Sequence, residues 1–344
     1  MPTTNSCVKT EMGKVAMRAF PLPDDPGPGN AIVRTTLSTV CGSDIHLVDE
    51  IPVPGGTPMG HEAVGVVEAV GAGVSGFAAG HRVAVSCLQC CGACARCREG
   101  NESVCQTFGA PANLVFGAQG EYFLVRGAET TMARIPDALA DEQVLLATDI
   151  MSTGFAAIER ADMQMGDTVA IFAQGPVGLC ATAGARALGA GTIIAVEGIP
   201  ERQAMAKRIG ADVVVEPANA VARIMELTGN VGVDIAVEAL GHQQTFENCC
   251  AVTRLGGTVS SVGVYGAFPT LTLPTSGSFM HRKVVTTLCP VGTRRLERLM
   301  SLVATGKVDL TPLLTHSMKI ADTPAAYDLF RSRDGGVLKI ALRP

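Results

Sequence analysis

The chain has 344 residues, of which 47% are hydrophobic and 17% are charged. This length exceeds the roughly 250–300 residues at which one core stops growing, so it predicts two domains, and the apolar fraction excludes a disordered chain. The formal net charge of −5 gives no global positive field, so neither nucleic acid nor an anionic membrane is expected as a partner.

The sequence offers no clear segment for export or membrane insertion. The first residues, MPTTNSCVKTEMGK, lack the apolar stretch of a signal peptide. The uncharged stretch 168–185 is interrupted by Gln174, Gly175 and Pro176, and it falls short of the roughly 20 apolar residues that a spanning helix needs. We therefore expect a soluble, cytoplasmic protein.

Short strand-like runs dominate the first half of the chain. Turn-rich segments at 21–30 and 53–59 separate them, and the runs themselves lie at 31–37, 63–71 and 81–85. Short runs divided by Gly and Pro predict an irregular, mostly β domain.

After about residue 150, apolar strands alternate with helical patterns such as 178–190 and 201–211. This alternation predicts a parallel sheet covered on both faces, as in a doubly wound dinucleotide-binding domain. The six predicted strands are 168–173, 192–196, 212–215, 233–239, 257–264 and 283–288. From about 290, two helices (294–306 and 324–332) and a last strand (337–342) are expected to pack on the first domain.

A glycine-containing turn joins the first of these strands to its helix, with the sequence Ala173-Gln-Gly175-Pro176-Val177-Gly178. Gly175 and Gly178 stand at the second and third positions of a dinucleotide-binding fingerprint, and Ala173 takes the first. Pro at the first helical turn leaves the later amides free to face phosphates. An ordinary strand–helix turn is the alternative, but the surrounding strand pattern favours pyrophosphate binding by residues 175–178.

An acidic residue, Glu197, ends the second strand, 22 residues beyond Gly175. A carboxylate at this place accepts the adenosine ribose hydroxyls and repels a 2′-phosphate, so it predicts NAD. Arg202 is near enough in sequence to contact the adenine or ribose, which keeps NADP as the alternative. A plain surface glutamate is the other reading of Glu197.

Six of the twelve cysteines lie between Cys87 and Cys105. Four thiolates within fifteen residues can close a tetrahedral zinc site with no open position, so they predict a structural zinc lobe over 87–105. The predicted ligands are Cys91, Cys94, Cys97 and Cys105, with Cys87 and Cys90 as spare thiols that could change the register. Unligated buried cysteines are one alternative, and an iron–sulfur cluster, disfavoured because the usual trailing Cys-Pro is missing, is another.

A second set of metal-ligand residue types is dispersed along the chain. It comprises Cys41 in Cys41-Gly-Ser43-Asp44-Ile-His46, the pair His61-Glu62, and Asp149 in ATDIMSTG. Taken singly, these residues could be a buried thiol, a core histidine and a helix cap. Together, beside a nucleotide domain, they predict a catalytic zinc with three protein ligands and one open position.

The motifs CGSDIH, GHEAVGVVEAVG, STGF, GPVG and the terminal LKIAL, together with the four-cysteine lobe, resemble those of zinc-dependent medium-chain alcohol dehydrogenases. The likeness covers nearly the whole chain, and 288–316 is similar to the tail of bacterial secondary-alcohol dehydrogenases. It implies an α/β protein in which a mostly β, GroES-like catalytic domain (1–150 and 290–344) surrounds a doubly wound Rossmann NAD-binding domain (151–289). Ala173 departs from the family's usual Gly.

The resemblance also implies roles for single residues. Cys41, His61 and Asp149 would hold the catalytic zinc, and Glu62 would be a carboxylate that can enter or leave the coordination sphere. Asp44 would accept a hydrogen bond from His61 and fix its tautomer.

The remaining implied roles concern the substrate and the proton. Ser43, one methyl smaller than the Thr of some relatives, would touch the substrate oxygen and leave room for a secondary carbon. The proton would pass through the cofactor ribose to His46, and Thr153 would approach the nicotinamide. NADP-dependent relatives carry Gly-Ser-Arg where this chain has Glu197-Gly-Ile, which favours NAD.

The expected activity is hydride transfer between an alcohol, preferably secondary, and NAD, with a ketone or aldehyde as product. We expect two zinc ions per chain, one catalytic and one structural, and a homo-oligomer, a tetramer rather than a dimer. A polyol, threonine or formaldehyde dehydrogenase of the same family is the alternative, as is a relative that binds nucleotide and zinc without catalysis. The net charge disfavours a nucleic-acid module built on the cysteine lobe.

Overall fold

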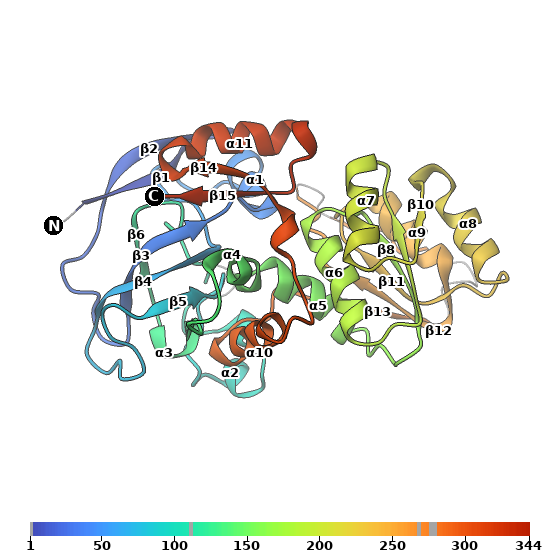
Figure 1. Ribbon diagram of the computed structural model, residues 1–344, viewed down its shortest axis with the longest axis horizontal. Helices are drawn as coiled ribbons and strands as arrows, with labels where there is room; N and C mark the ends of the chain where they lie inside the picture. Colours follow the sequence, from blue (N-terminus) through green and yellow to red (C-terminus); the bar gives the residue numbers. More distant parts are fainter. Residues whose placement is uncertain (1–2, 110–112, 267–269, 275–280) are drawn as a thin grey trace. The chain divides into compact units, whose positions relative to one another are not determined.

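The computed structural model describes residues 3–109, 113–266, 270–274 and 281–344 (Figure 1). The chain divides into two compact units. Unit 1 comprises residues 1–152 and 289–344, and unit 2 comprises residues 153–288. Within the described residues, no helix combines the length and the apolar composition that crossing a membrane requires.

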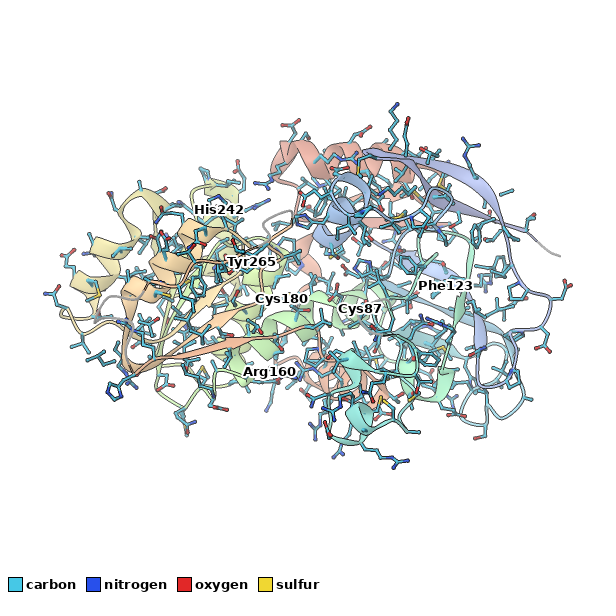
Figure 2. The ribbon with its side chains drawn as sticks, turned by 180° about the vertical axis from the view of Figure 1, so that it is seen from behind. Cys87, Phe123, Arg160, Cys180, His242 and Tyr265 are labelled. Atoms are coloured by element: carbon cyan, nitrogen blue, oxygen red, sulfur yellow. The ribbon has the colours of Figure 1, made fainter. Side chains whose placement is uncertain are left out.

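Unit 1 is built on a seven-stranded sheet with the order β14-β15-β3-β4-β5-β7, in which β6 also pairs with β3. Its strands are β3 (Ala31–Ser38), β4 (Ala63–Val70), β5 (Arg82–Val85), β6 (Tyr122–Val125), β7 (Met132–Arg134), β14 (Leu314–Lys319) and β15 (Lys339–Arg343). The strands predicted in the first half are therefore confirmed as β3, β4 and β5. Their buried valines pack with Phe123, which is labelled in Figure 2, because successive side chains of a strand alternate between its faces.

A hairpin of β1 (Thr3–Glu11) and β2 (Lys14–Pro21) forms a separate two-stranded sheet. This hairpin was not among the elements predicted from the sequence. Its turn contains Gly13 at a φ of +79°, a conformation that favours glycine.

The helices of unit 1 are short, apart from two in the C-terminal segment. They are α1 (Gly42–Asp49), α2 (Ala95–Arg98), α3 (Ala128–Thr131), α4 (Asp141–Val144), α10 (Thr293–Ala304) and α11 (Thr323–Ser332). A further helix, α5 (Ile150–Glu159), runs across the boundary between the units.

Unit 2 holds a six-stranded parallel sheet with the order β10-β9-β8-β11-β12-β13. Its strands are β8 (Thr168–Phe172), β9 (Thr192–Val196), β10 (Val213–Val215), β11 (Val233–Glu238), β12 (Thr253–Ser261) and β13 (Lys283–Thr286). The helices between them are α6 (Pro176–Ala187), α7 (Pro200–Ile209), α8 (Ala220–Leu227) and α9 (Gln243–Val252). All six predicted strands form, and β12 begins four residues earlier than predicted, with its pairing to β11 shifted near Gly256 (φ +77°).

The strand order places a topological switch point between β8 and β11. From β8 the chain moves outward to β9 and β10, then returns to β11 on the other side of β8. Ligands of doubly wound sheets bind outside the carboxyl ends of the strands at such a point. The glycine turn at 173–178 follows the carboxyl end of β8 and is therefore at this point.

Candidate catalytic and cofactor sites

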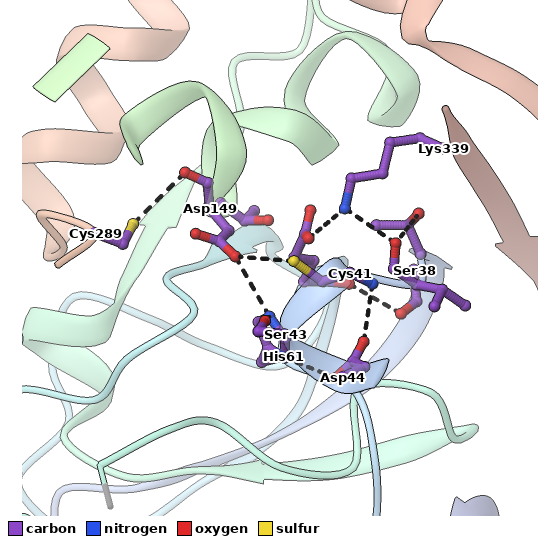
Figure 3. A network of polar contacts seen from close by, with 12 residues as sticks. Ser38, Cys41, Ser43, Asp44, His61, Asp149, Cys289 and Lys339 are labelled. Atoms are coloured by element: carbon purple, nitrogen blue, oxygen red, sulfur yellow. Dashed lines mark hydrogen bonds and ion pairs between the residues drawn. The ribbon is translucent and has the colours of Figure 1, made fainter. Parts of the chain in front are cut away.

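Four metal-ligand side chains from three separate parts of unit 1 converge on one buried point, and we call them the mixed donor set (Figure 3). One ligand atom from each of Cys41, His61, Glu62 and Asp149 lies within 4.8 Å of the others. Cys41 immediately precedes α1, His61 and Glu62 immediately precede β4, and Asp149 immediately precedes α5. Because these positions are ends of elements, the two neighbours 61 and 62 are not forced onto opposite faces of a strand.

Asp44 orients the His61 ring. Its Oδ1 lies 2.9 Å from His61 Nδ1, and its Oδ2 accepts hydrogen bonds from the Cys41 amide (3.0 Å) and from Gln119 Nε2 (2.9 Å). The Tyr327 hydroxyl donates to Gln119 Oε1 at 2.9 Å, so a buried chain of contacts runs from Tyr327 to His61. A carboxylate on Nδ1 leaves Nε2 available to a metal.

The other ring nitrogen of His61, Nε2, faces Ser43 and the rest of the donor set. His61 Nε2 lies 3.1 Å from Ser43 Oγ and 3.3 Å from Asp149 Oδ2, and Asp149 Oδ2 lies 3.7 Å from Cys41 Sγ. Sulfur, imidazole nitrogen and carboxylate oxygen around one point are the donors that Zn²⁺ takes, and three of them with a neighbouring space are typical of a catalytic site.

The pKa values in the mixed donor set reflect burial working against nearby charges. Burial raises the pKa of the Cys41 thiol even though Lys339 opposes it. Burial lowers the pKa of His61, but the Asp44 carboxylate and the Asp149 contact outweigh it and raise the pKa well above its usual range. Burial alone would raise the pKa of Asp149, yet the contact with His61 holds it below its usual range. Several acidic ligands lie close together and require a nearby positive charge, which a dication would supply. These residues therefore fit zinc.

Lys339 sets Glu62 apart from the other three ligands. The Lys339 ammonium contacts Glu62 Oε1 and donates to the Val40 carbonyl at 3.1 Å, and both side chains are buried. Glu62 Oε2 is buried, and among the described residues it has no hydrogen-bond partner. Lys339 was not predicted from the sequence, where the available signal was a lysine inside the apolar run 337–342.

The predicted catalytic residues Ser43 and His46 lie on the same short helix, α1. Ser43 is placed against His61, as described above. His46 is partly exposed, and its Nδ1 lies 2.9 Å from Glu50 Oε2. The structure therefore brings Ser43 to the donor set, whereas His46 contacts the carboxylate of Glu50, the residue that directly follows the helix.

A second donor cluster is formed by the cysteines of the lobe. The four sulfur atoms of Cys91, Cys94, Cys97 and Cys105 lie within 4.8 Å of one another. Two amide groups point at one of them: Ala93 N and Cys94 N lie 3.4 and 3.3 Å from Cys91 Sγ. The Cys97 amide in particular lowers the pKa of Cys94 to about 6. Four sulfurs at this spacing fit a closed tetrahedral zinc site.

The two spare thiols of the lobe region lie outside this cluster. Cys90 donates to the Thr130 carbonyl at 3.2 Å, and Cys87 lies beside Asp149 and Cys289. The predicted register of 91, 94, 97 and 105 is thus the one whose sulfur atoms come together.

In unit 2, the glycine turn forms the N-terminus of α6, with Gly175 capping it and Pro176 as its first residue. A Cβ at Gly178 would lie 1.9 Å from the Ala173 carbonyl oxygen, so only glycine fits where the helix approaches the strand. Ala173 adopts a φ of +71°, a left-handed conformation that an alanine reaches only with strain.

Glu197 is almost buried, with 7% of its surface exposed, directly after β9. Its Oε2 accepts from the Gln174 amide at 2.9 Å, and its Oε1 accepts from the Gly198 and Ile199 amides at 2.8 and 3.0 Å. The carboxylate therefore connects the glycine turn to the end of β9. This role was not predicted from the sequence.

The other predicted cofactor residues lie at separate places. Arg202 is on α7, and its Nη1 would lie 3.9 Å from a Cβ at Gly175, so it borders the glycine turn. Val177 follows Pro176 in the first turn of α6. Thr153 is buried on α5 and belongs to unit 2.

Both units match known families. The alcohol dehydrogenase GroES-like domain matches residues 27–137, and the zinc-binding dehydrogenase family matches residues 176–305. An alcohol dehydrogenase from Cupriavidus necator is 43% identical over 366 aligned positions, which cover 98% of each chain. An NADP-dependent isopropanol dehydrogenase from Thermoanaerobacter brockii is 35% identical over 91% of this chain and 92% of its own.

Among solved structures, the alcohol dehydrogenase TADH from Thermus sp. ATN1 superposes with a TM-score of 0.90. It is 32% identical and covers 98% of this chain and 99% of its own. The fold is therefore a GroES-like domain joined to a Rossmann domain, and these relatives support zinc-dependent alcohol oxidoreduction as the activity. The chain belongs to the zinc-binding alcohol dehydrogenase family.

Proposed function

We propose that the chain oxidises secondary alcohols to ketones with NAD, and catalyses the reverse reaction, at the mixed donor set of unit 1. One observation carries the proposal. Three ligands of different chemistry converge on one buried point with the Ser43 hydroxyl beside them, while Lys339 engages the fourth ligand, Glu62. This arrangement favours three protein ligands and one open position rather than a closed site.

In this proposal Cys41, His61 and Asp149 hold the catalytic zinc. When bound there, zinc would supply a Lewis acid that lowers the pKa of an alcohol hydroxyl. Asp44 holds His61 in the tautomer whose Nε2 faces the metal.

The proton of the alcohol is held by the chain's own hydroxyl and histidine groups. Ser43 Oγ, next to His61 Nε2, would accept the alcohol proton while it passes its own hydroxyl proton on toward His46, and the small side chain leaves room for a secondary carbon. We propose that His46, whose ring is partly exposed, exchanges this proton with water, and a bound cofactor would supply a ribose hydroxyl near both residues.

We assign cofactor binding to unit 2. Gly175, Pro176, Val177 and Gly178 would place helix amides against the pyrophosphate, with Arg202 beside the turn. Thr153 would approach the nicotinamide. The buried Glu197 carboxylate supports NAD, because a 2′-phosphate beside it would bring two negative charges together. NADP is the alternative, since the Thermoanaerobacter brockii relative is NADP-dependent by name.

The four-cysteine lobe would hold a second zinc that is structural. Its four thiolates fill a tetrahedral coordination sphere, so no position is left for a substrate. The lobe would therefore contribute to stability and not to the chemical step.

The test is a panel of purified zinc-loaded protein with NAD or NADP against simple primary, simple secondary and polyhydroxy alcohols. We expect the highest kcat/KM for NAD with a secondary alcohol, and two zinc ions per chain by elemental analysis. Turnover of polyols alone would select a polyol dehydrogenase. No turnover of any alcohol at full zinc content would favour the non-catalytic alternative.

We further propose a cytoplasmic homotetramer, for which the resemblance to the family is the support. Sedimentation velocity distinguishes a tetramer from a dimer.

A further inference from the structure

Two buried cysteines that the proposed mechanism does not use lie beside Asp149. Cys87 (labelled in Figure 2) follows β5, and Cys289 (labelled in Figure 3) lies where the chain returns to unit 1. We call these two residues the thiol pair. Their sulfur atoms and an Asp149 carboxylate oxygen all lie within 4.8 Å of one another. Cys289 Sγ also lies 3.5 Å from the Asp149 carbonyl oxygen.

Among the described residues, three groups of metal-ligand side chains reach this proximity. The mixed donor set and the four-cysteine lobe are two of them, and the thiol pair with Asp149 is the third. Two further buried thiols of unit 1, Cys7 and Cys90, belong to none of the three groups. Cys7 lies in an apolar cluster with Val40 and Met59.

The backbone around the thiol pair is fixed by hydrogen bonds. The Cys87 amide donates to the Thr148 carbonyl at 3.0 Å, which ties it to the residue before Asp149. On the other side, the Ser152 hydroxyl donates to the Pro290 carbonyl at 2.6 Å. The two sulfurs are thus held against the Asp149 segment by short connections, which reduces the ordering needed to bind an ion there.

We propose that Cys87, Cys289 and the Asp149 carboxylate form a second cation site in unit 1, selective for thiophilic cations such as Cd²⁺. Two sulfurs and one carboxylate make a soft donor set, which prefers Cd²⁺ or Cu⁺ to Mg²⁺ or Ca²⁺. On binding, two S–H bonds are replaced by two S–Cd bonds and two protons leave to solvent. The two thiolate charges then balance the charge of the dication.

Asp149 would be shared between this site and the catalytic zinc, and in this respect the inference rests on the proposed function. A cation at the thiol pair draws on the same carboxylate that the mixed donor set uses. The site is therefore an inhibitory one, through which a thiophilic cation lowers turnover without displacing zinc.

The experiment begins with the zinc-loaded protein, whose zinc content is measured first. Cadmium chloride is then added in steps, and the ultraviolet sulfur-to-cadmium charge-transfer absorption and the bound cadmium and zinc after desalting are recorded. We expect one extra cadmium per chain with zinc retained. The extra cadmium should be lost in Cys87→Ser and in Cys289→Ser, and retained in the matched control Cys7→Ser.

Three outcomes would overturn the inference: cadmium that replaces an equal amount of zinc, extra cadmium that persists in both variants, or a thiol count two short because the pair is a disulfide. Cys87→Ala and Cys289→Ala repeat the test if a serine variant does not fold, as judged by circular dichroism. A starting zinc content below two per chain would count against the proposed zinc sites and not against the thiol pair. The two failures are therefore distinguishable.

Discussion

Two donor clusters of unit 1, the four-cysteine lobe and the mixed donor set, are built in opposite ways. The lobe takes four identical side chains from one loop between residues 91 and 105, whereas the mixed donor set brings together side chains from residues 41, 61, 62 and 149. Local amides contact the lobe sulfurs. The mixed donor set depends on distant side chains: Gln119 lies 75 residues from Asp44, and Lys339 lies 277 residues from Glu62.

This difference predicts different roles: the lobe should contribute to stability, and the mixed donor set should contribute to catalysis. A metal closed in by four thiolates holds together a loop that has little core of its own, so losing it destabilises the fold. A mixed set is held by the folded unit around it, and its ligands can be changed at a smaller cost in stability. The predictions below test this division, beginning with the largest effect.

Replacing Cys41 by Ser should lower kcat/KM by at least about a thousandfold, because a Lewis acid contributes several kcal/mol and each 1.4 kcal/mol is tenfold in rate. Steady-state kinetics measures the loss, and elemental analysis should show one zinc instead of two. NAD affinity, measured by calorimetry, should be unchanged. Wild-type turnover in Cys41→Ser would remove Cys41 from the proposed ligand set.

In the lobe, Cys94→Ser should lower the free energy of unfolding by at least about 3 kcal/mol, since a structural metal is lost. Thermal melting and zinc content measure the effect, while kcat at low temperature should stay near the wild-type value. Cys90→Ser is the matched control, because Cys90 lies in the same segment but outside the cluster. Loss of catalysis in Cys94→Ser with unchanged melting would contradict a purely structural lobe.

The same contrast explains what the sequence could predict. The lobe register follows from spacing alone, and the parallel sheet of unit 2 follows from the alternation of apolar strands with helices; β9 has the predicted bounds, Thr192–Val196. The residues of the mixed donor set were predicted from their ligand types beside a nucleotide domain, and the resemblance assigned their roles, since nothing local joins Cys41 to Asp149. Lys339, Gln119 and Tyr327 were missed because their contacts span more than 70 residues and carry no local pattern.

Two buried lysines allow the mixed donor set to be tested without touching a ligand. Lys339 contacts Glu62, whereas the equally buried Lys9 donates only to carbonyl groups in its described contacts, those of Leu47 (2.7 Å) and Ile51 (2.9 Å). Lys339→Met should free Glu62 to bind the metal, lower kcat about 10–100-fold and slow zinc loss to a chelator. Lys9→Met should lower stability alone.

Both lysine variants remove a buried charge, so melting alone does not separate them. The rate at which zinc is lost to a chelator does separate the two variants. The double variant Lys339→Met/Glu62→Gln should recover most of the lost turnover. Equal kcat in the two single variants would show that Lys339 does not position Glu62.

The residues of the glycine turn in unit 2 are close together in sequence, like those of the lobe. Its hydrogen-bond partner Glu197 is nevertheless expected to influence the choice between NAD and NADP. Glu197→Gln keeps an oxygen acceptor for the Gln174 amide but removes the negative charge. The ratio of kcat/KM for NAD to that for NADP should fall about tenfold, which corresponds to about 1.4 kcal/mol. An unchanged ratio would assign Glu197 to the turn alone.

The smallest expected effect concerns the alanine at the start of that turn. Ala173 has a φ of +71°, and left-handed backbone costs a non-glycine residue roughly 1–2 kcal/mol, whereas glycine loses roughly 0.5–1 kcal/mol of chain entropy on folding. Ala173→Gly should therefore raise the free energy of unfolding by up to about 1 kcal/mol in chemical denaturation. Ala170→Gly, buried in the middle of β8, is the control and should lower it, because extended backbone gives glycine no advantage. If both variants are destabilised equally, the first position of the turn carries no strain, and the departure from glycine there is neutral.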